Sequence, residues 1–124
     1  MKPFLALLFV AVSFAACSQQ SKSFQNIDNK EFSELMNDSN TVILDVRTPE
    51  EFEQGHIPHA TLINLRDPNF SQELDSLDQS KTYLVYCGTG SRSSKASALL
   101  GKKGFKNIYN LENGFNQWNG PKEK

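Results

Sequence analysis

One stretch of the chain holds the residues best suited to chemistry, and it reads Cys87-Gly88-Thr89-Gly90-Ser91-Arg92. It lies between an apolar run at residues 83–86 and a segment of helical spacing at residues 93–100, so a strand, a tight loop and a helix are expected. The N–H groups of such a loop converge at a helix N-terminus and favour negative charge there. Cys87 should therefore place its sulfur among these groups and be largely thiolate near neutral pH.

The other residues of this stretch fit an anion-binding loop. Gly88 and Gly90 permit the close or left-handed backbone that such a loop needs. Arg92 adds a fixed positive charge and a planar set of donors. A free cysteine packed as a small hydrophobic residue would account for Cys87, but not for the glycines and the arginine that follow it. The pattern predicts a nucleophile inside an anion-binding loop.

The pattern Cys-x-x-Gly-x-Arg resembles the active loop of rhodanese domains, which pass a sulfane sulfur through a cysteine persulfide. Two further stretches resemble signatures of the same family. The first is Leu44-Asp45-Val46-Arg47 with residues 50–60, and the second spans residues 104–118. The resemblance covers residues 24–118 and implies a rhodanese-type sulfurtransferase in which Cys87 and Arg92 are catalytic.

A persulfide needs a site that stabilises its outer sulfur, which is an anion. Converging N–H groups can do this as they would for an oxyanion. The candidates are the N–H groups of Gly88, Thr89, Gly90, Ser91 and Arg92. The Arg92 side chain adds charge, or it binds carbonyl groups of the loop and holds its shape, and both roles are compatible.

Asp45 and Arg47 are candidates for orienting the site. Asp45 could orient Arg92 or the loop, or it could accept hydrogen bonds from nearby backbone N–H groups. Arg47 is expected to pair with Glu51 on the next helix, at small energetic value.

Two histidines and two aromatic residues are assigned structural roles. His56 matches a position where rhodanese-like domains usually carry histidine, and we expect it to support a turn. His59 lies where the family more often has glycine. Two histidines three residues apart without further ligands make a poor metal site, so no metal is expected. Phe115 and Trp118 are expected to cover the core.

The order of elements predicts the fold. Strands are expected at residues 24–27, 41–46, 61–65, 82–86 and 107–111, and helices follow Asp28, Thr48, residue 69 and the cysteine loop. This alternation predicts an α/β, three-layer, rhodanese-like fold with a central, mostly parallel five-stranded sheet and helices on both faces. Active sites of such sheets lie at the carboxyl ends of the strands, where Cys87, Asp45 and Arg47 fall.

The N-terminal stretch resembles an export signal. Residues 1–16 are predicted to be a signal peptide, because residues 4–16 are apolar except for one serine and too short for a bilayer span. The stretch ends Phe14-Ala15-Ala16-Cys17, which resembles a bacterial lipoprotein cleavage box. The alternative is an ordinary secretory peptide with Cys17 incidental. Lipidation at Cys17 would anchor the protein to a membrane, facing the periplasm or cell exterior.

The sequence also predicts the domain boundaries and the kinds of partner. Residues 17–23 form a polar tether, residues 24–120 the rhodanese-like domain and residues 121–124 a tail. The 124 residues carry a formal net charge of −1 with scattered basic residues, so no nucleic-acid partner is expected. No cofactor is expected, and the protein is predicted to be a monomer. With one thiol in the domain, turnover needs a small sulfur donor (persulfide, polysulfide or thiosulfate) and an external thiol acceptor.

Three alternatives and a substrate hypothesis remain. Cysteine phosphatases have five residues between Cys and Arg, whereas this loop has four, which disfavours phosphate. A non-catalytic partner-binding module would usually lack the cysteine. An exposed thiol of low pKa could instead sense oxidants. Many rhodanese domains carry a basic residue after the cysteine, whereas Gly88 stands here, so we expect the dianion thiosulfate to be a poor substrate.

Overall fold

The sheet is the part of the fold that places the cysteine loop. A computed structural model describes residues 23–124. Its strands are β1 (Gln25–Ile27), β2 (Thr41–Asp45), β3 (Thr61–Leu62), β4 (Thr82–Tyr86) and β5 (Asn107–Leu111). They form one sheet in the order β1-β5-β4-β2-β3, and every adjacent pair is parallel. The predicted five-stranded sheet is confirmed, and β4 lies at its centre.

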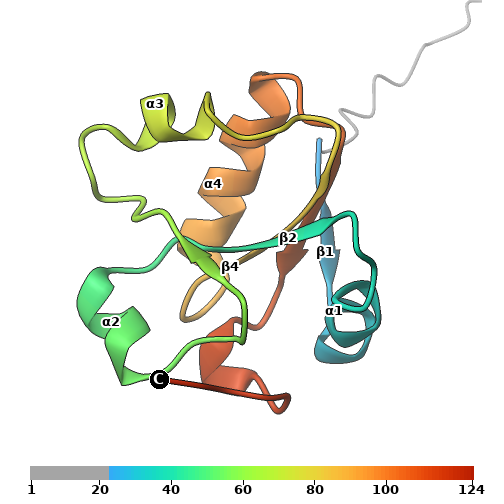
Figure 1. Ribbon diagram of the computed structural model, residues 1–124, viewed down its shortest axis with the longest axis vertical. Helices are drawn as coiled ribbons and strands as arrows, with labels where there is room; N and C mark the ends of the chain where they lie inside the picture. Colours follow the sequence, from blue (N-terminus) through green and yellow to red (C-terminus); the bar gives the residue numbers. More distant parts are fainter. Residues whose placement is uncertain (1–22) are drawn as a thin grey trace, which may run out of the picture.

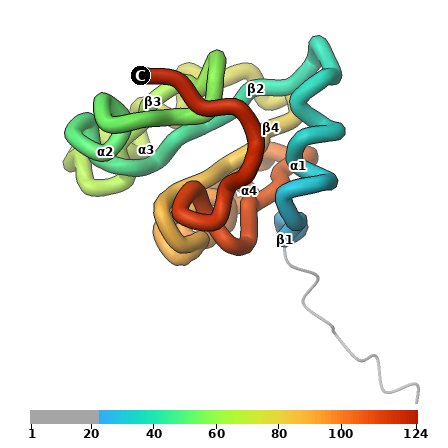
Figure 2. The backbone as a smooth tube through the Cα atoms, turned by 90° about the horizontal axis from the view of Figure 1, so that it is seen from below, coloured from blue at the N-terminus to red at the C-terminus, as the bar shows by residue number. Residues whose placement is uncertain are grey.

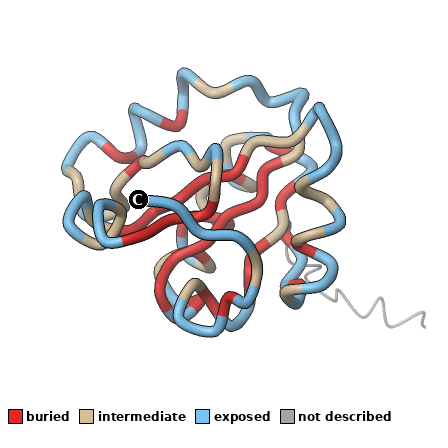
Figure 3. The backbone as a smooth tube through the Cα atoms, turned by 60° about the horizontal axis from the view of Figure 1, so that its bottom comes forward, coloured by how far each residue is buried: buried red, intermediate tan, exposed pale blue. Residues whose placement is uncertain are grey.

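Helices cover both faces of this sheet (Figure 1). They are α1 (Asn29–Leu35), α2 (Pro49–Gln54), α3 (Phe70–Leu74), α4 (Ser91–Lys102) and the 3₁₀ helix η1 (Phe115–Gln117). On one face, residues of α3 and α4 such as Leu74 and Leu100 pack against the strands. On the other face, Phe32 of α1 packs with Trp118 and Tyr86. The predicted three-layer arrangement is confirmed, and Figure 3 shows that buried residues concentrate on the central strands.

Two of the predicted helix starts are visible in hydrogen bonds. The Asp28 carboxylate accepts a hydrogen bond from the N–H of Glu31 at 2.9 Å and caps α1. Thr48 and Glu51 form a reciprocal capping box at the start of α2, with Pro49 at the first helical position. Each of these contacts joins residues only three positions apart, and therefore the sequence alone predicts them.

Two elements end three residues earlier than expected, whereas β1 and β2 are each one residue shorter than expected. The third strand ends at Leu62 rather than at residue 65, because it pairs only with β2 at the sheet edge and the chain then turns at Asn64, whose side chain accepts the N–H of Arg66. Helix α3 ends at Leu74 rather than at residue 77, since the following N–H groups bond to carbonyls three residues back. Neither difference affects the end of β4.

The C-terminal residues lie against the end of α2 (Figures 1 and 2). The backbones of His56 and Glu123 exchange two hydrogen bonds of 2.8 and 2.9 Å. The indole N–H of Trp118 donates to the carbonyl of Pro121 at 3.0 Å. Residues 121–123 are thus joined to the domain. Among residues 23–124, no helix combines the length and apolar character needed to cross a membrane, and the signal-peptide and Cys17 predictions lie outside the described residues.

Candidate active site

The central strand delivers Cys87 to the carboxyl edge of the sheet, as predicted. Strand β4 is buried from Tyr83 onward, and α4 begins at Ser91 after the loop. Gly90 stands at the N-cap of α4 with a φ of 98°, in the left-handed region that favours glycine. The strand, loop and helix of the sequence prediction are therefore all present.

The sulfur of Cys87 accepts hydrogen bonds from this loop. The N–H of Gly90 donates to Sγ at 3.1 Å, and the hydroxyl of Ser93 lies 3.3 Å from Sγ. Burial by itself raises the pKa of the Cys87 thiol, but the Ser93 hydroxyl and the N–H groups of Ser93, Thr89 and Gly90 outweigh it and lower the pKa below its ordinary value. Cys87 is therefore ionised to thiolate more readily than a cysteine in free solution.

Only part of the expected set of donors faces the sulfur. Thr89 and Gly90 do, whereas the N–H groups of Gly88, Ser91 and Arg92 are not among those bonded to Sγ. The sequence pattern had not been interpreted as placing Ser93 at the site. Its helical spacing could have indicated this, because residues 93, 96, 97 and 100 lie on one face of α4 and all four are buried. A serine on the inward face of the first turn is a candidate for contact with the loop.

Neighbouring backbone fixes the shape of the loop. A side chain at Gly90 would overlap the carbonyl oxygen of Glu112, and one at Gly114 would overlap the carbonyl oxygen of Gly88. The carbonyl of Cys87 accepts the N–H of Phe115 at 2.7 Å. The segment after β5 therefore holds the cysteine loop in place.

Arg92 does not bind loop carbonyls. Its guanidinium donates to both carboxylate oxygens of Glu51, with Nη1–Oε1 at 2.7 Å and Nη2–Oε2 at 2.9 Å. This bidentate pair is the main cause that lowers the pKa of Glu51 to about 2. The same hydrogen bonds raise the pKa of Arg92. The helix α2 and the cysteine loop are thus joined by a charged pair.

The predicted pairing of Arg47 with Glu51 is wrong. Arg47 pairs instead with Asp45 (Nη2–Oδ2, 2.8 Å) and donates to the carbonyl of Gly55 at 2.7 Å. Asp45 also accepts a hydrogen bond from the backbone N–H of Arg47 at 2.9 Å, which confirms its predicted bonding to nearby backbone N–H groups. The side chain that binds and orients Arg92 is that of Glu51, not that of Asp45. Both side chains of the Asp45–Arg47 pair are buried, and their bidentate hydrogen bonds favour this pairing over one with the half-buried Glu51.

The remaining predictions concern structural residues. His56 stacks on Phe52, with ring centroids 3.8 Å apart, and its Nδ1 lies 3.1 Å from the carbonyl oxygen of Phe52, which supports the turn as expected. His59 has a φ of 66°, which accounts for glycine being more usual at this position. Trp118 is buried in the core, whereas Phe115 is half-buried beneath the guanidinium of Arg47.

Cys87 is buried, so the expectation of an exposed thiol, which applied to sulfur transfer as well as to oxidant sensing, is wrong. Its exposed fraction is 0%. The loop folds over the sulfur, and Gly88 is itself buried with Arg92, Glu51 and Asn116 next to it. Arg92 and Glu51 retain 23% and 35% side-chain exposure. A donor sulfur can reach Sγ only when some of these groups move.

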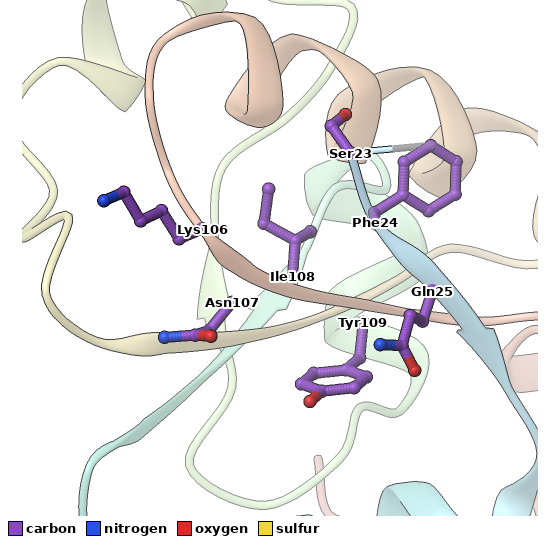
Figure 4. A pocket seen from close by; sticks show the side chains of 7 residues that line it. All are labelled: Ser23, Phe24, Gln25, Lys106, Asn107, Ile108 and Tyr109. Carbon is purple, nitrogen blue, oxygen red and sulfur yellow. The ribbon is translucent and has the colours of Figure 1, made fainter. Parts of the chain in front are cut away.

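A groove lies beside the residues that cover Cys87. It is lined by Arg47, Glu51, Gln54, Gly55, Phe115 and Asn116. Another hollow lies at the amino ends of β1 and β5, opposite the cysteine, and is lined by Ser23, Phe24, Gln25, Lys106, Asn107, Ile108 and Tyr109 (Figure 4). Cys87 lines neither hollow, but Glu51 and Asn116 of the groove lie next to Gly88, so the candidate active site is the groove beside the cysteine loop.

The sequence model of the rhodanese-like domain matches residues 28–121. The chain belongs to the rhodanese-like domain family. A tRNA uridine(34) hydroxylase of Pelagibacter ubique is 37% identical over 100 residues, which are 78% of this chain and 33% of that protein. The thiosulfate sulfurtransferase GlpE of Pseudomonas syringae is 31% identical over 88 residues, which cover 71% of this chain and 81% of that protein.

Solved structures agree with this assignment. A rhodanese-like domain protein from Staphylococcus aureus superimposes with a TM-score of 0.67 at 30% identity, covering 76% of this chain and 90% of that one. The chain spans about a third of the length of the tRNA uridine(34) hydroxylases that it matches. The rhodanese-like domain, with sulfurtransferases among its relatives, is thus the shared unit.

The packing of Gly90 leads to a stability prediction. Gly90→Ala should lower the free energy of unfolding by clearly more than Gly104→Ala, because both positions have φ near 100° but only residue 90 faces a backbone carbonyl. At Gly104 the nearest atom is the end of the Gln79 side chain at 3.4 Å, so the cost there is about 1–2 kcal/mol of backbone strain. Urea unfolding of both variants measures the difference, and equal losses would contradict the described packing of the loop.

Proposed function

We propose that the chain is a rhodanese-type sulfurtransferase that carries sulfane sulfur as a persulfide on Cys87 and passes it to a thiol or another nucleophilic acceptor. The observation that supports this most directly is a sulfur of lowered pKa that faces the N–H of Gly90 and the hydroxyl of Ser93 at the carboxyl end of the central strand. Such a site stabilises negative charge on sulfur and keeps bulk water away from it.

The proposed cycle has two displacement steps. The Cys87 thiolate attacks the outer sulfur of a donor, the donor's S–S bond breaks, and the donor leaves as a thiolate. An acceptor thiolate then attacks the outer sulfur of the Cys87 persulfide, and Sγ leaves with the electron pair of the broken bond. No oxidant or cofactor enters either step. The domain contains one cysteine, so the acceptor is external.

Two other activities are less well supported. Oxidant sensing would need the same opening of the loop as sulfur transfer, because Cys87 is buried, and no observation favours a sulfenate over a persulfide. Hydroxylation of a tRNA, named for some relatives, is not part of the proposal, since the chain spans about a third of those proteins and its basic residues are scattered.

The persulfide gives a direct test. The full chain carrying Cys17→Ser, so that Cys87 is its only thiol, should gain 32 Da (roughly one sulfur atom) after incubation with a thiol persulfide and lose this mass on reduction. Cyanide should release one thiocyanate per gained sulfur. The matched Cys17→Ser, Cys87→Ser double variant should gain nothing. A sulfenate on Cys87 without bound sulfur would instead indicate a sensor.

The charges beside Gly88 bear on the donor. A side chain at this position would lie 3.3 Å from Nη2 of Arg92 and 3.7 Å from Oε2 of Glu51, so an anion approaching here meets a carboxylate as well as a guanidinium. Glu51 thus offsets the charge that would attract a dianion. We propose that persulfides, and not thiosulfate, are the favoured donors.

This proposal predicts a change in thiosulfate kinetics. Glu51→Gln should lower the KM for thiosulfate by about threefold, because it removes a negative charge near the dianion in a screened, partly exposed site. Glu50→Gln is the matched control, since Glu50 is exposed on the same helix and does not contact Arg92. Steady-state kinetics measures both. A micromolar KM for thiosulfate in the unmodified protein, or equal effects of the two variants, would contradict the proposal.

We also propose that the protein is exported and anchored through a lipid on Cys17, facing the periplasm or the cell exterior. The sequence Phe14-Ala15-Ala16-Cys17 after an apolar stretch supports this proposal. In a bacterial host, the protein should incorporate labelled palmitate and remain with membranes at high salt. Cys17→Ser should lose both properties. Export with cleavage at another site and no label would favour an ordinary secretory peptide.

A further inference from the structure

The hydroxyl of Ser93 lies between two acceptors. Its oxygen is 3.3 Å from Sγ of Cys87 and 3.2 Å from the carbonyl oxygen of Gly90. The side chain has 0% exposure, so water does not compete for it. A hydroxyl has one proton to donate, and therefore it serves one of these two acceptors well at a time.

The charge on Sγ decides which acceptor the hydroxyl serves. When Cys87 is a thiol, its S–H can donate to the Ser93 oxygen, and the Ser93 hydroxyl donates to Gly90. When Cys87 is a thiolate, Sγ is the stronger acceptor, because hydrogen bonds to ionised groups are about twice as strong as neutral ones. The hydroxyl then turns to the sulfur.

Loading with sulfur changes this balance again. In Cys87–S–S⁻ the negative charge lies on the outer sulfur, and Sγ becomes a bridging atom that is a weak acceptor. The Ser93 hydroxyl can return to the carbonyl of Gly90 without a change of position, since both distances are already satisfied. Ser93 therefore stabilises the empty thiolate more than the loaded persulfide.

We propose that Ser93 is a catalytic residue of sulfur delivery, because it stabilises Sγ of Cys87 as the leaving group when the acceptor takes the outer sulfur. This inference rests on the proposed function. The step is R–S⁻ + Cys87–S–S⁻ → R–S–S⁻ + Cys87–S⁻: the bond between Sγ and the outer sulfur breaks, the bond from the outer sulfur to R–S forms, and both sides carry two negative charges. Charge develops on Sγ during this step, where Ser93 can meet it.

The role predicts opposite effects on the two half-reactions. Without the hydroxyl, the equilibrium between empty and loaded protein should shift about tenfold toward the loaded form, the amount expected from one charged hydrogen bond. Since thiol exchange divides such a change about evenly between forward and reverse rates, loading becomes about threefold faster and delivery about threefold slower. A residue that merely supports the loop would slow both.

The chain offers a matched control for this test. Ser97 lies one turn further along α4, also has 0% exposure, and its hydroxyl has no hydrogen-bond partner. Ser93→Ala and Ser97→Ala remove the same atom from neighbouring positions of one buried helix face. Ser93→Thr keeps the hydroxyl and is expected to restore both rates toward those of the unmodified protein.

The experiment uses the full chain with Cys17→Ser and the couple of glutathione persulfide and glutathione. Loading, delivery and the equilibrium are followed by rapid quenching and intact mass, at a pH where thiolate absorbance shows that Cys87 is ionised in every variant. We expect Ser93→Ala to speed loading, slow delivery and move the thiolate titration to higher pH, while Ser97→Ala changes none of these.

Each other outcome has a definite meaning. If Ser93→Ala leaves both rates unchanged, changes them in the same direction, or behaves like Ser97→Ala, the proposed role of Ser93 is wrong while sulfur carriage by Cys87 stands. If the unmodified protein takes up no sulfur from glutathione persulfide or other sulfane donors, the proposed function fails and the role of Ser93 fails with it. Near-ultraviolet circular dichroism checks that each variant is folded.

Discussion

The constraint on which this site depends is the cost of placing a negatively charged sulfur where water cannot reach it. Burial alone disfavours the Cys87 thiolate, and an uncompensated buried charge would neutralise instead. The loop offsets this cost with backbone donors and the Ser93 hydroxyl, all within one turn of the start of α4. The anion-binding chemistry is therefore built into the backbone and does not need a charged side chain against the sulfur.

The rest of the fold keeps these donors in position. Strand β5 and the segment after it approach the loop so closely that residues 90 and 114 must be glycine. The buried side chain of Asn110, on β5, also reaches the carbonyl of Gly90 at 3.4 Å. On the side of the groove, the bidentate pair of Arg92 with Glu51 joins the loop to α2. The loop is thus held by neighbours on both sides of the central strand.

Much of this could be predicted from the sequence, because the signals are local. The apolar run before Cys87, the glycines after it and the capping residues Asp28 and Thr48 each act within a few residues. The charged partners could not be predicted in the same way. Helical spacing suggested that Arg47 would meet Glu51, but the partner of Glu51 comes from 41 residues away, and only the folded sheet brings Arg92 there. The burial of Cys87 likewise depends on segments distant in sequence.

All five strands run in the same direction, and this determines where the start of the domain lies relative to Cys87. Ser23 lies beside the amino end of β1 (Figure 4), whereas Cys87 follows the carboxyl end of β4 at the opposite rim of the sheet. Ser23 is therefore separated from the sulfur of Cys87 by the full height of the strands. A molecule that reaches Cys87 therefore approaches the domain at the rim farthest from Ser23.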